Sequence, residues 1–228
     1  MKKWISSILI IAGIALIGAQ FLPDLLIKNQ AKKSVEIVED ITVEQIEENN
    51  KKEGVYDYSA IEDVDPSSAI INTYKFQGEN VIGQLIIPDL GIDLPILKGV
   101  TEANMLAGAG TMMPDIKMGE GNYPLASHYR KDPKLLFGNL LNAKEGMQVR
   151  ITDKINVYEY EIYETVLVPE TAIYMIEEKQ AEERGKPIIS LMTCYYTSKN
   201  GKRFFALGEL VDSYPYRMKN MEKIVGNQ

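Results

Sequence analysis

The chain contains one cysteine, Cys194, and one histidine, His128, so no other Cys/His pair is available. Cys194 ends an apolar run that begins at Ile188, and a polar stretch at residues 197–201 separates this run from a second apolar run. The pattern predicts a strand, a turn and a returning strand. Arg203 lies at the start of the returning strand, so we expect its guanidinium and the thiol at the same end of the hairpin.

These three side-chain types can together catalyse nucleophilic attack on an amide. A free thiol has a pKa of about 8.5, and a nearby cation favours the thiolate that attacks. An imidazolium at His128 can give a proton to the departing amine, because its pKa lies near neutral pH. A fixed donor at Arg203 can stabilise the oxyanion, which typically contributes about 10²- to 10³-fold in rate. Lys202 is a rival, but an ammonium lacks the planar fork of a guanidinium.

Each of these residues also has a plainer interpretation. A lone cysteine is most often a small buried hydrophobe, and Arg203 alone would be an exposed charge at a strand end. His128 alone would be a hydrogen-bonded structural or surface histidine, and Thr193 a residue that simply favours strands. The functional interpretation therefore depends on the context of all three candidates.

That context resembles the sortases, and most closely the class A housekeeping type. The resemblance rests on Leu191-Met192-Thr193-Cys194 followed by Arg203, and on Ala126-Ser127-His128 upstream. A strand motif of this kind combined with a spaced histidine and arginine is a specific signal. The resemblance extends over residues 81–211 through further matching motifs. These are Leu94-Pro95-Ile96, residues 103–109, residues 121–125, Leu136-Phe137, Thr152-Asp153 and Gly208-Glu209-Leu210.

The sequence departs from the family pattern at two positions. Ser190 stands where the family usually has threonine, and Ser127 stands where it usually has glycine. Neither residue is a reacting group, so the departures bear on substrate detail and leave the expected chemistry unchanged.

The resemblance implies a transpeptidase. Cys194 would attack the Thr–Gly bond of an LPxTG-type sorting signal on a surface protein, and an amine of a peptidoglycan precursor would resolve the acyl-enzyme. By the same resemblance, the apolar part of residues 169–187 would form a wall of the peptide groove. The implied catalytic residues are His128, Cys194 and Arg203. The implied substrate-binding residues are Ala126, Met192 and Thr193.

The hydrophobic pattern from residue 81 onward independently favours an all-β fold with short helices. Short apolar segments alternate with turn residues, which is typical of a closed or nearly closed β-barrel. The family resemblance implies eight strands. The segments predicted as strands are residues 81–87, 92–97, 123–128, 148–152, 157–168, 188–194 and 204–211, and a short helix is predicted over residues 102–106.

The chain begins with Lys2 and Lys3, followed by an uncharged apolar run over residues 4–22. About 20 apolar residues span a bilayer, so we expect residues 1–27 to form a retained transmembrane anchor. A cleaved signal peptide is the alternative, although no clean cleavage site is present. The lysines on both sides of the run do not decide its orientation. The family resemblance implies a single-pass protein of the cell membrane with an extracellular catalytic domain.

Three further regions follow from composition. Residues 35–65 contain eleven acidic residues and only two lysines, and we expect residues 28–75 to form an acidic, solvated and partly helical spacer. The predicted catalytic barrel covers residues 76–215, and a polar tail covers residues 216–228. A helix that binds a partner is the alternative for the spacer.

The sequence predicts no cofactor and no metal. A lone His and a lone Cys lack the paired spacing of a zinc site. Some class A sortases bind calcium through acidic residues before the histidine, but only Asp115 and Glu120 occur there in this chain, so we expect calcium independence. The barrel region is close to neutral and lacks the clustered basic face that nucleic-acid binding requires.

Other functions remain open at this stage. One is a hydrolytic cysteine peptidase or an L,D-transpeptidase-like enzyme, although the latter would need a Ser-His-Gly-Cys motif that is absent. Another is a non-catalytic extracellular binding module on a membrane stalk. A pilin-polymerising sortase is a variant of the main hypothesis, but Asp65-Pro66-Ser67 lacks the aromatic residue of its lid motif.

Overall fold

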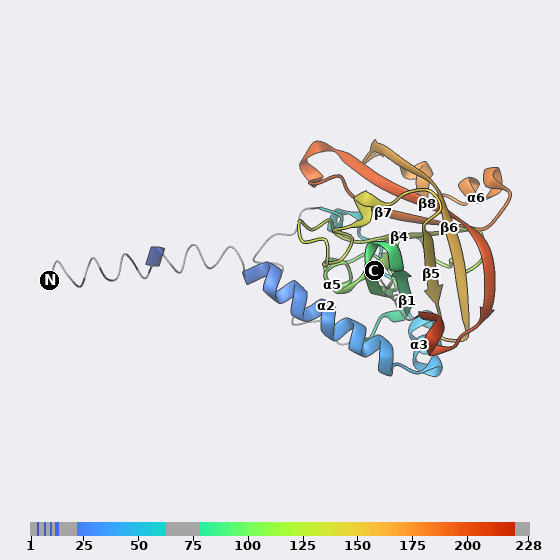
Figure 1. Ribbon diagram of the computed structural model, residues 1–228, viewed down its shortest axis with the longest axis horizontal. Helices are drawn as coiled ribbons and strands as arrows, with labels where there is room; N and C mark the ends of the chain where they lie inside the picture. Colours follow the sequence, from blue (N-terminus) through green and yellow to red (C-terminus); the bar gives the residue numbers. More distant parts are fainter. Residues whose placement is uncertain are drawn as a thin grey trace, which may run out of the picture.

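The computed structural model describes residues 4, 7, 10, 12–13, 22–62 and 78–221 of the 228-residue chain. Its centre is a closed barrel in the order β1-β2-β3-β4-β7-β8-β6-β5 (Figure 1). The strands are β1 (Val81–Ile87), β2 (Ile92–Leu97), β3 (Ala109–Thr111), β4 (Asn122–Ala126), β5 (Gln148–Thr152), β6 (Asn156–Pro169), β7 (Ile188–Cys194) and β8 (Lys202–Pro215). The eight-stranded barrel predicted from the family resemblance is confirmed.

The helices lie between or outside the strands, and apart from the 19-residue α2 they are short. The α-helices are α2 (Leu22–Asp40), α3 (Val43–Lys51), α5 (Glu102–Ala107) and α6 (Lys179–Arg184). The 3-10 helices are η1 (Tyr58–Ala60), η2 (Pro88–Leu90), η3 (Leu140–Asn142), η4 (Ile173–Ile176), η5 (Ser198–Asn200) and η6 (Met218–Met221).

Sequence patterning missed one strand, β3. It has three residues and pairs in parallel with β2 and antiparallel with β4. A three-residue segment is too short for a period-two pattern to be visible. Its central residue is Gly110, where an added Cβ would lie 2.6 Å from the carbonyl oxygen of Gly99. Glycine is therefore required here by the close approach of two backbones.

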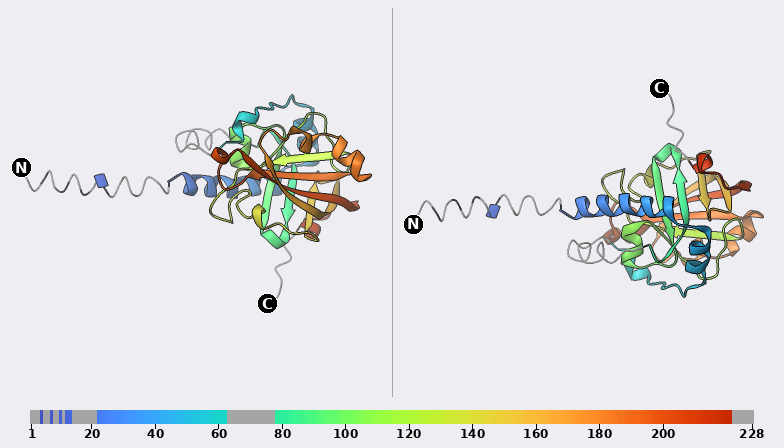
Figure 2. Two further views of the ribbon diagram at one scale, coloured as in Figure 1. Left: turned by 90° about the horizontal axis from the view of Figure 1, so that it is seen from above. Right: turned by 90° about the horizontal axis from the view of Figure 1, so that it is seen from below.

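The N-terminal helices pack against the barrel. Helix α2 runs along its outside against β1 and β2, as the views from above and below also show (Figure 2). Val38 of α2 and Ile46 of α3 are buried against Val81 and Leu97 of the barrel. Helix α3 begins with a capping box, in which Thr42 and Gln45 bond to each other's backbone N–H. The described part of the expected spacer thus contains two helices, and apolar residues on both of them, such as Val38 and Ile46, are buried and not solvated.

The predicted membrane anchor lies largely outside the described residues. Helix α2 begins at Leu22, where the predicted apolar run ends. Within the part of the chain that the structure describes, no helix has both the length and the hydropathy of a membrane span.

Two apolar clusters fill the barrel and its surface. The larger cluster lies inside the barrel and includes Leu85, Ile151 and Tyr160, which are fully buried. The second cluster, which we call the groove cluster, surrounds Cys194. It consists of Ile61, Val100, Met105, Met112, Ala126, Val168, Ala172, Met175, Ile176, Met192, Cys194, Phe205 and Leu207.

The C-terminal end also contacts the barrel. Met221 in η6 is buried against Ile86 and Val157, although the sequence predicts a polar tail over residues 216–228. Residues 222–228 lie outside the described part of the chain.

Candidate active site

Cys194 and Arg203 face each other across two neighbouring strands. They are direct partners in the antiparallel register of β7 and β8. The turn between them contains Gly201 with a left-handed φ of 64°. Tyr196 also has a positive φ, of 63°, a conformation that aromatic residues rarely adopt. The predicted hairpin therefore brings the thiol and the guanidinium to one end of the barrel.

His128 reaches the same end from β4. Strands β4 and β7 are parallel, with Ala126 opposite Met192. Beyond this pair, the hydroxyl of Thr193 donates to the carbonyl oxygen of Ser127 at 2.9 Å. His128 and Cys194 therefore follow corresponding positions at the same end of adjacent strands. His128 is 3% exposed, and its carbonyl oxygen accepts from the N–H of Phe137 at 3.1 Å.

The three predicted substrate-binding residues fall on different faces. Ala126 and Met192 belong to the groove cluster together with Cys194. Thr193 lies between Met192 and Cys194 on β7, so its side chain points to the opposite face. It is fully buried and holds β7 to the strand of the histidine. These contacts show that Thr193 links β7 to the segment that follows β4, and its assignment as a substrate-binding residue stays a prediction.

A segment that the sequence analysis did not assign to the site covers the thiol. We call residues 56–61 the cover segment. Tyr56 bridges to Val100, the N–H of Asp57 donates to the carbonyl oxygen of Val100 at 2.9 Å, and the hydroxyl of Tyr58 donates to the carbonyl oxygen of Met112. Ile61, at the end of the segment, is 5% exposed and packs in the groove cluster.

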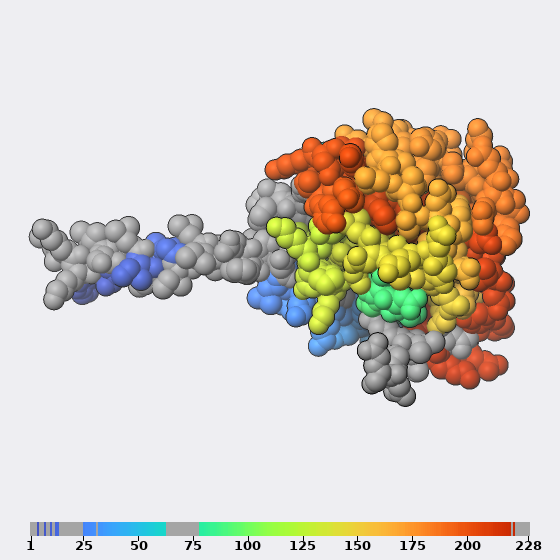
Figure 3. Space-filling model, turned by 45° about the horizontal axis from the view of Figure 1, so that its top comes forward, coloured from blue at the N-terminus to red at the C-terminus, as the bar shows by residue number. Residues whose placement is uncertain are grey.

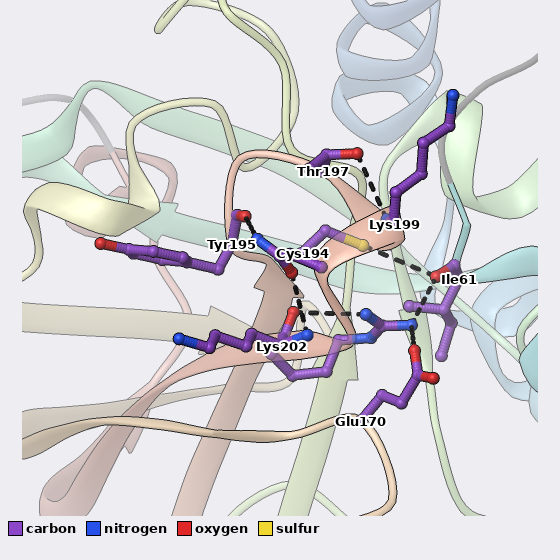
Figure 4. Close-up of polar contacts among 9 residues, drawn as sticks. Ile61, Glu170, Cys194, Tyr195, Thr197, Lys199 and Lys202 are labelled. Atoms are coloured by element: carbon purple, nitrogen blue, oxygen red, sulfur yellow. Dashed lines mark hydrogen bonds and ion pairs between the residues drawn. The ribbon is translucent and has the colours of Figure 1, made fainter.

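The carbonyl oxygen of Ile61 accepts from both reactive side chains. The Cys194 thiol donates to it over 3.6 Å, and Nη2 of Arg203 donates over 3.2 Å. Figure 4 shows this oxygen between the sulfur and the guanidinium. Cys194 is only 3% exposed, and its thiol lies beneath Ile61 of the predicted spacer. No sequence motif marks Ile61, because its contact is made by a backbone carbonyl.

Arg203 has a second partner that the sequence did not indicate. Nη2 of Arg203 lies 3.1 Å from Oε2 of Glu170, which follows the last residue of β6 (Figure 4). The guanidinium also donates to the carbonyl oxygen of Lys202 at 3.2 Å. A single side chain therefore contacts the cover segment, the end of β6 and its own strand, as the planar fork of arginine allows.

The apolar segment between β6 and β7 borders the thiol. We call η4 and α6, residues 173–184, the wall segment. Met175 and Ile176 are buried in the groove cluster, whereas Ile173 and Tyr174 are exposed. The segment thus has an apolar inner side at Cys194, as the sequence analysis expected of this region.

Three tyrosine rings pack together next to the β7–β8 turn. The ring of Tyr196 packs edge-on against Tyr129 with centroids 5.5 Å apart, and against Tyr195 with centroids 4.6 Å apart. These contacts place the loop after β4 beside the β7–β8 turn on one face of the molecule (Figure 3). Burial raises the pKa of the Tyr129 hydroxyl, so this ring is neutral at physiological pH.

The acidic residues before the histidine share a cleft of about 350 Å³ with one acid from the wall segment. Asp115, Glu120 and Glu178 line it. Lys117 pairs with Glu120 at 3.4 Å, and Glu178 accepts from a backbone N–H. Within the described ranges, no three His, Cys, Asp or Glu side chains come together as a possible metal site.

Comparison with known proteins agrees with this geometry. Residues 85–211 match the family model described as the sortase domain. The chain is 34% identical to sortase A of Listeria monocytogenes over 210 residues, which cover 92% of this chain and 91% of that protein. It is 30% identical to sortase A of Bacillus anthracis over 207 residues, covering 91% of this chain and 93% of that protein.

A solved structure agrees as well. The crystal structure of Listeria monocytogenes sortase A matches with a TM-score of 0.56 at 36% identity, covering 61% of this chain and 93% of that chain. The family model matches more than half of the chain, and both relatives align along most of their length. The chain therefore belongs to the sortase family of cysteine transpeptidases.

Proposed function

We propose that this protein is a membrane-anchored transpeptidase that cleaves an LPxTG-type sorting signal between Thr and Gly and transfers the protein to an amine of a cell-wall precursor. The observation that supports it most strongly is the cross-strand pair of Cys194 and Arg203, with His128 two residues after the end of the adjoining strand β4. This arrangement combines a nucleophile, a fixed cation and a titratable acid at one end of a rigid barrel.

In the first half-reaction, the thiolate of Cys194 attacks the carbonyl carbon of the signal's threonine. The carbon–sulfur bond forms, and the carbonyl oxygen becomes an oxyanion that Arg203 stabilises. The carbon–nitrogen bond then breaks, and His128 gives its proton to the departing glycine amine. The product is a thioester between Cys194 and the new C-terminal threonine.

In the second half-reaction, a primary amine of the acceptor attacks the thioester. The new carbon–nitrogen bond forms, the carbon–sulfur bond breaks, and the amine loses a proton to His128. The enzyme is thereby restored without a cofactor, because each proton released in one half-reaction is used in the other.

The composition of the groove cluster favours an apolar peptide as the substrate. Met105, Met112, Met175, Met192 and Ala126 belong to the same buried cluster as Cys194. Methionine side chains are flexible and polarisable, so they adapt to branched or cyclic side chains such as those of leucine and proline. We assign the Leu-Pro part of the signal to this surface.

We also place the barrel outside the cell, with the apolar run of residues 4–22 as its membrane anchor. The substrates would then be surface proteins that carry the signal, and the acceptor would be a peptidoglycan precursor at the same membrane. A protease added to intact cells should digest the barrel and leave a short membrane-bound fragment.

The proposal is tested with the full chain in detergent micelles, an LPxTG-type peptide and a panel of primary amines. Mass spectrometry should detect a thioester on Cys194 and a ligated product for at least one amine. Cys194→Ala should form neither. Ligation that persists in Cys194→Ala would exclude the covalent mechanism.

The same assay separates the alternatives. Cleavage with water as the only acceptor would favour a hydrolytic peptidase. Binding of the peptide without any cleavage would favour a non-catalytic binding module. Activation several-fold by millimolar calcium would contradict the expected calcium independence.

A further inference from the structure

Asn122, the first residue of β4, connects three parts of the molecule although it is only 2% exposed. Its Nδ2 donates to the carbonyl oxygens of Met175 at 3.3 Å and Glu177 at 3.0 Å. Its Oδ1 accepts from the hydroxyl of Ser190 on β7 at 2.8 Å. Its backbone N–H donates to Oε2 of Glu178 at 3.0 Å. One residue thus joins β4, β7 and the wall segment.

The side-chain contacts of Asn122 leave little freedom to the amide. Both amide hydrogens and the amide oxygen have partners, which is close to the full capacity of this group. Loss of the amide would leave two backbone carbonyls and one buried hydroxyl without these bonds. Buried polar groups without partners are costly, so the wall segment would shift to restore them.

The points of attachment lie at the inner side of the groove. The two carbonyls that Asn122 binds flank Ile176, and Ile176 packs in the groove cluster with Met192 and Cys194. Ser190 is two residues before Met192 on β7, so its side chain lies on the same face of the strand. The amide therefore fixes the position of the wall segment relative to the groove floor, by which we mean the face of β7 that carries Ser190, Met192 and Cys194.

The residue before Asn122 strengthens this attachment. Gly121 has a positive φ of 50°, and a Cβ built on it would lie 2.3 Å from the carboxylate oxygens of Glu178. A larger residue would displace Glu178 from the N–H of Asn122. The wall segment is thus held at this turn by the amide of Asn122 and the carboxylate of Glu178. Glycine at position 121 leaves room for that carboxylate.

We propose that Asn122 is a positioning residue for the sorting peptide, which acts by locking the wall segment to the hydroxyl of Ser190 on the groove floor. The inference rests on the proposed function, because that function makes this groove the binding site of the peptide. It also explains why a serine is compatible with the position where the family usually has threonine, since both residues supply the hydroxyl.

The test compares Asn122→Ala with the wild-type full chain in the peptide assay. We expect KM for the peptide to rise about tenfold, because two hydrogen bonds to the wall are lost. The rate of Cys194 alkylation by iodoacetamide should stay within about twofold, because Asn122 touches neither the thiol nor its cationic partner. Hydrogen exchange should accelerate in residues 173–184.

Asn49→Ala is the matched control. Asn49 is also a buried asparagine, and its Nδ2 donates to the carbonyl oxygens of Gly78 at 3.4 Å and Val81 at 2.9 Å. It ties α3 to β1, away from the groove cluster. We expect this variant to lower Tm while KM is unchanged. Equal changes in KM for both variants would show that Asn122 acts through stability alone and would overturn the inference.

A second pair of variants covers the case in which Asn122→Ala does not fold. Ser190→Ala removes the donor to the amide and should raise KM about threefold, as expected for one hydrogen bond, whereas Ser190→Thr should behave as wild type. Equal KM values in both Ser190 variants would refute the inference. Unchanged KM in a folded Asn122→Ala would do the same. Absence of cleavage by the wild-type chain would instead refute the proposed function.

Discussion

Two segments border the thiol of Cys194, and the protein holds them by different means. The cover segment, residues 56–61, is attached by a few backbone bonds and by one carbonyl that faces Cys194 and Arg203. The wall segment, residues 173–184, is attached through the buried amide of Asn122. The bonds of the cover segment run mostly through its own backbone, whereas those of the wall segment converge on one buried side chain.

This difference indicates which segment has to move. The carbonyl of Ile61 accepts from the two side chains that the proposed reaction uses, the nucleophile Cys194 and the oxyanion donor Arg203. On the proposed function, we therefore expect a peptide to bind at the thiol only after the cover segment has left. The wall segment does not use these donors, and its apolar side chains are available to the peptide in place. Four experiments test whether the two segments differ in this way.

Arg203 is the residue whose loss we expect to have the largest effect. It contacts the cover segment through Ile61 and the start of the loop before the wall through Glu170. Arg203→Ala should lower kcat/KM for an LPxTG-type peptide about 10²- to 10³-fold, because a fixed oxyanion donor is lost. Arg203→Lys should recover only part of the loss, because an ammonium keeps the charge without the fork. Full recovery by lysine would contradict the role of the fork.

The second experiment loosens the cover segment alone. Ile61→Ala removes buried apolar contacts worth about 2–5 kcal/mol when fully packed. The substitution destabilises the closed position of the cover segment, so local opening of this segment should become more frequent. We expect iodoacetamide to modify Cys194 at least about tenfold faster. Peptide cleavage should also increase.

Ile46→Ala serves as the control for this experiment. Ile46 is equally buried, at 2% exposure, but packs between α3 and the barrel. Its substitution should lower stability without speeding the modification of Cys194. If both variants react at the wild-type rate, the cover segment does not limit access to the thiol.

The third experiment tests the ion pair that links Arg203 to the wall side. Glu170 is about half exposed, with its side chain at 49% exposure, so the pair is worth little. Glu170→Gln should change kcat/KM less than about fivefold. A loss as large as that of Arg203→Ala would mean that Glu170, and not the backbone at Ile61, determines the orientation of the guanidinium.

The smallest effect is expected at the far end of the wall. Glu209 on β8 pairs with Arg184 and Lys186, and hydrogen bonds to these two cations hold its pKa below the usual value for glutamate. Its contribution to stability is therefore complete above the ordinary pKa of about 4.3 and is lost as the pH falls through the lowered value.

Thermal unfolding of Glu209→Gln measures this contribution. We expect a slightly lower Tm than wild type at neutral pH, and a difference that disappears in acid well below about pH 4. A difference that persists unchanged in acid would mean that the charge of Glu209 does not hold the end of α6.

The sequence predicted best those elements that a local pattern of apolar and polar residues reveals. The hairpin that carries Cys194 and Arg203 was predictable because two apolar runs flank a polar turn, and cross-strand pairing then follows from the register. The short strand β3 was not predictable, because its pairing depends on neighbours distant in the chain. The role of Thr193 in substrate binding stays a prediction, and the sequence alone did not reveal that its hydroxyl bonds to Ser127.

The sequence alone limits the candidates for a Cys/His pair to one, because the chain contains one cysteine and one histidine. It also determined a barrel of short strands through its apolar periodicity. The contact of Ile61 with the thiol and the contacts of Asn122 with the wall segment can be seen only in the folded structure. Both contacts involve backbone carbonyls, which every residue possesses, so their partners are set by where the folded chain passes and not by which residue is present.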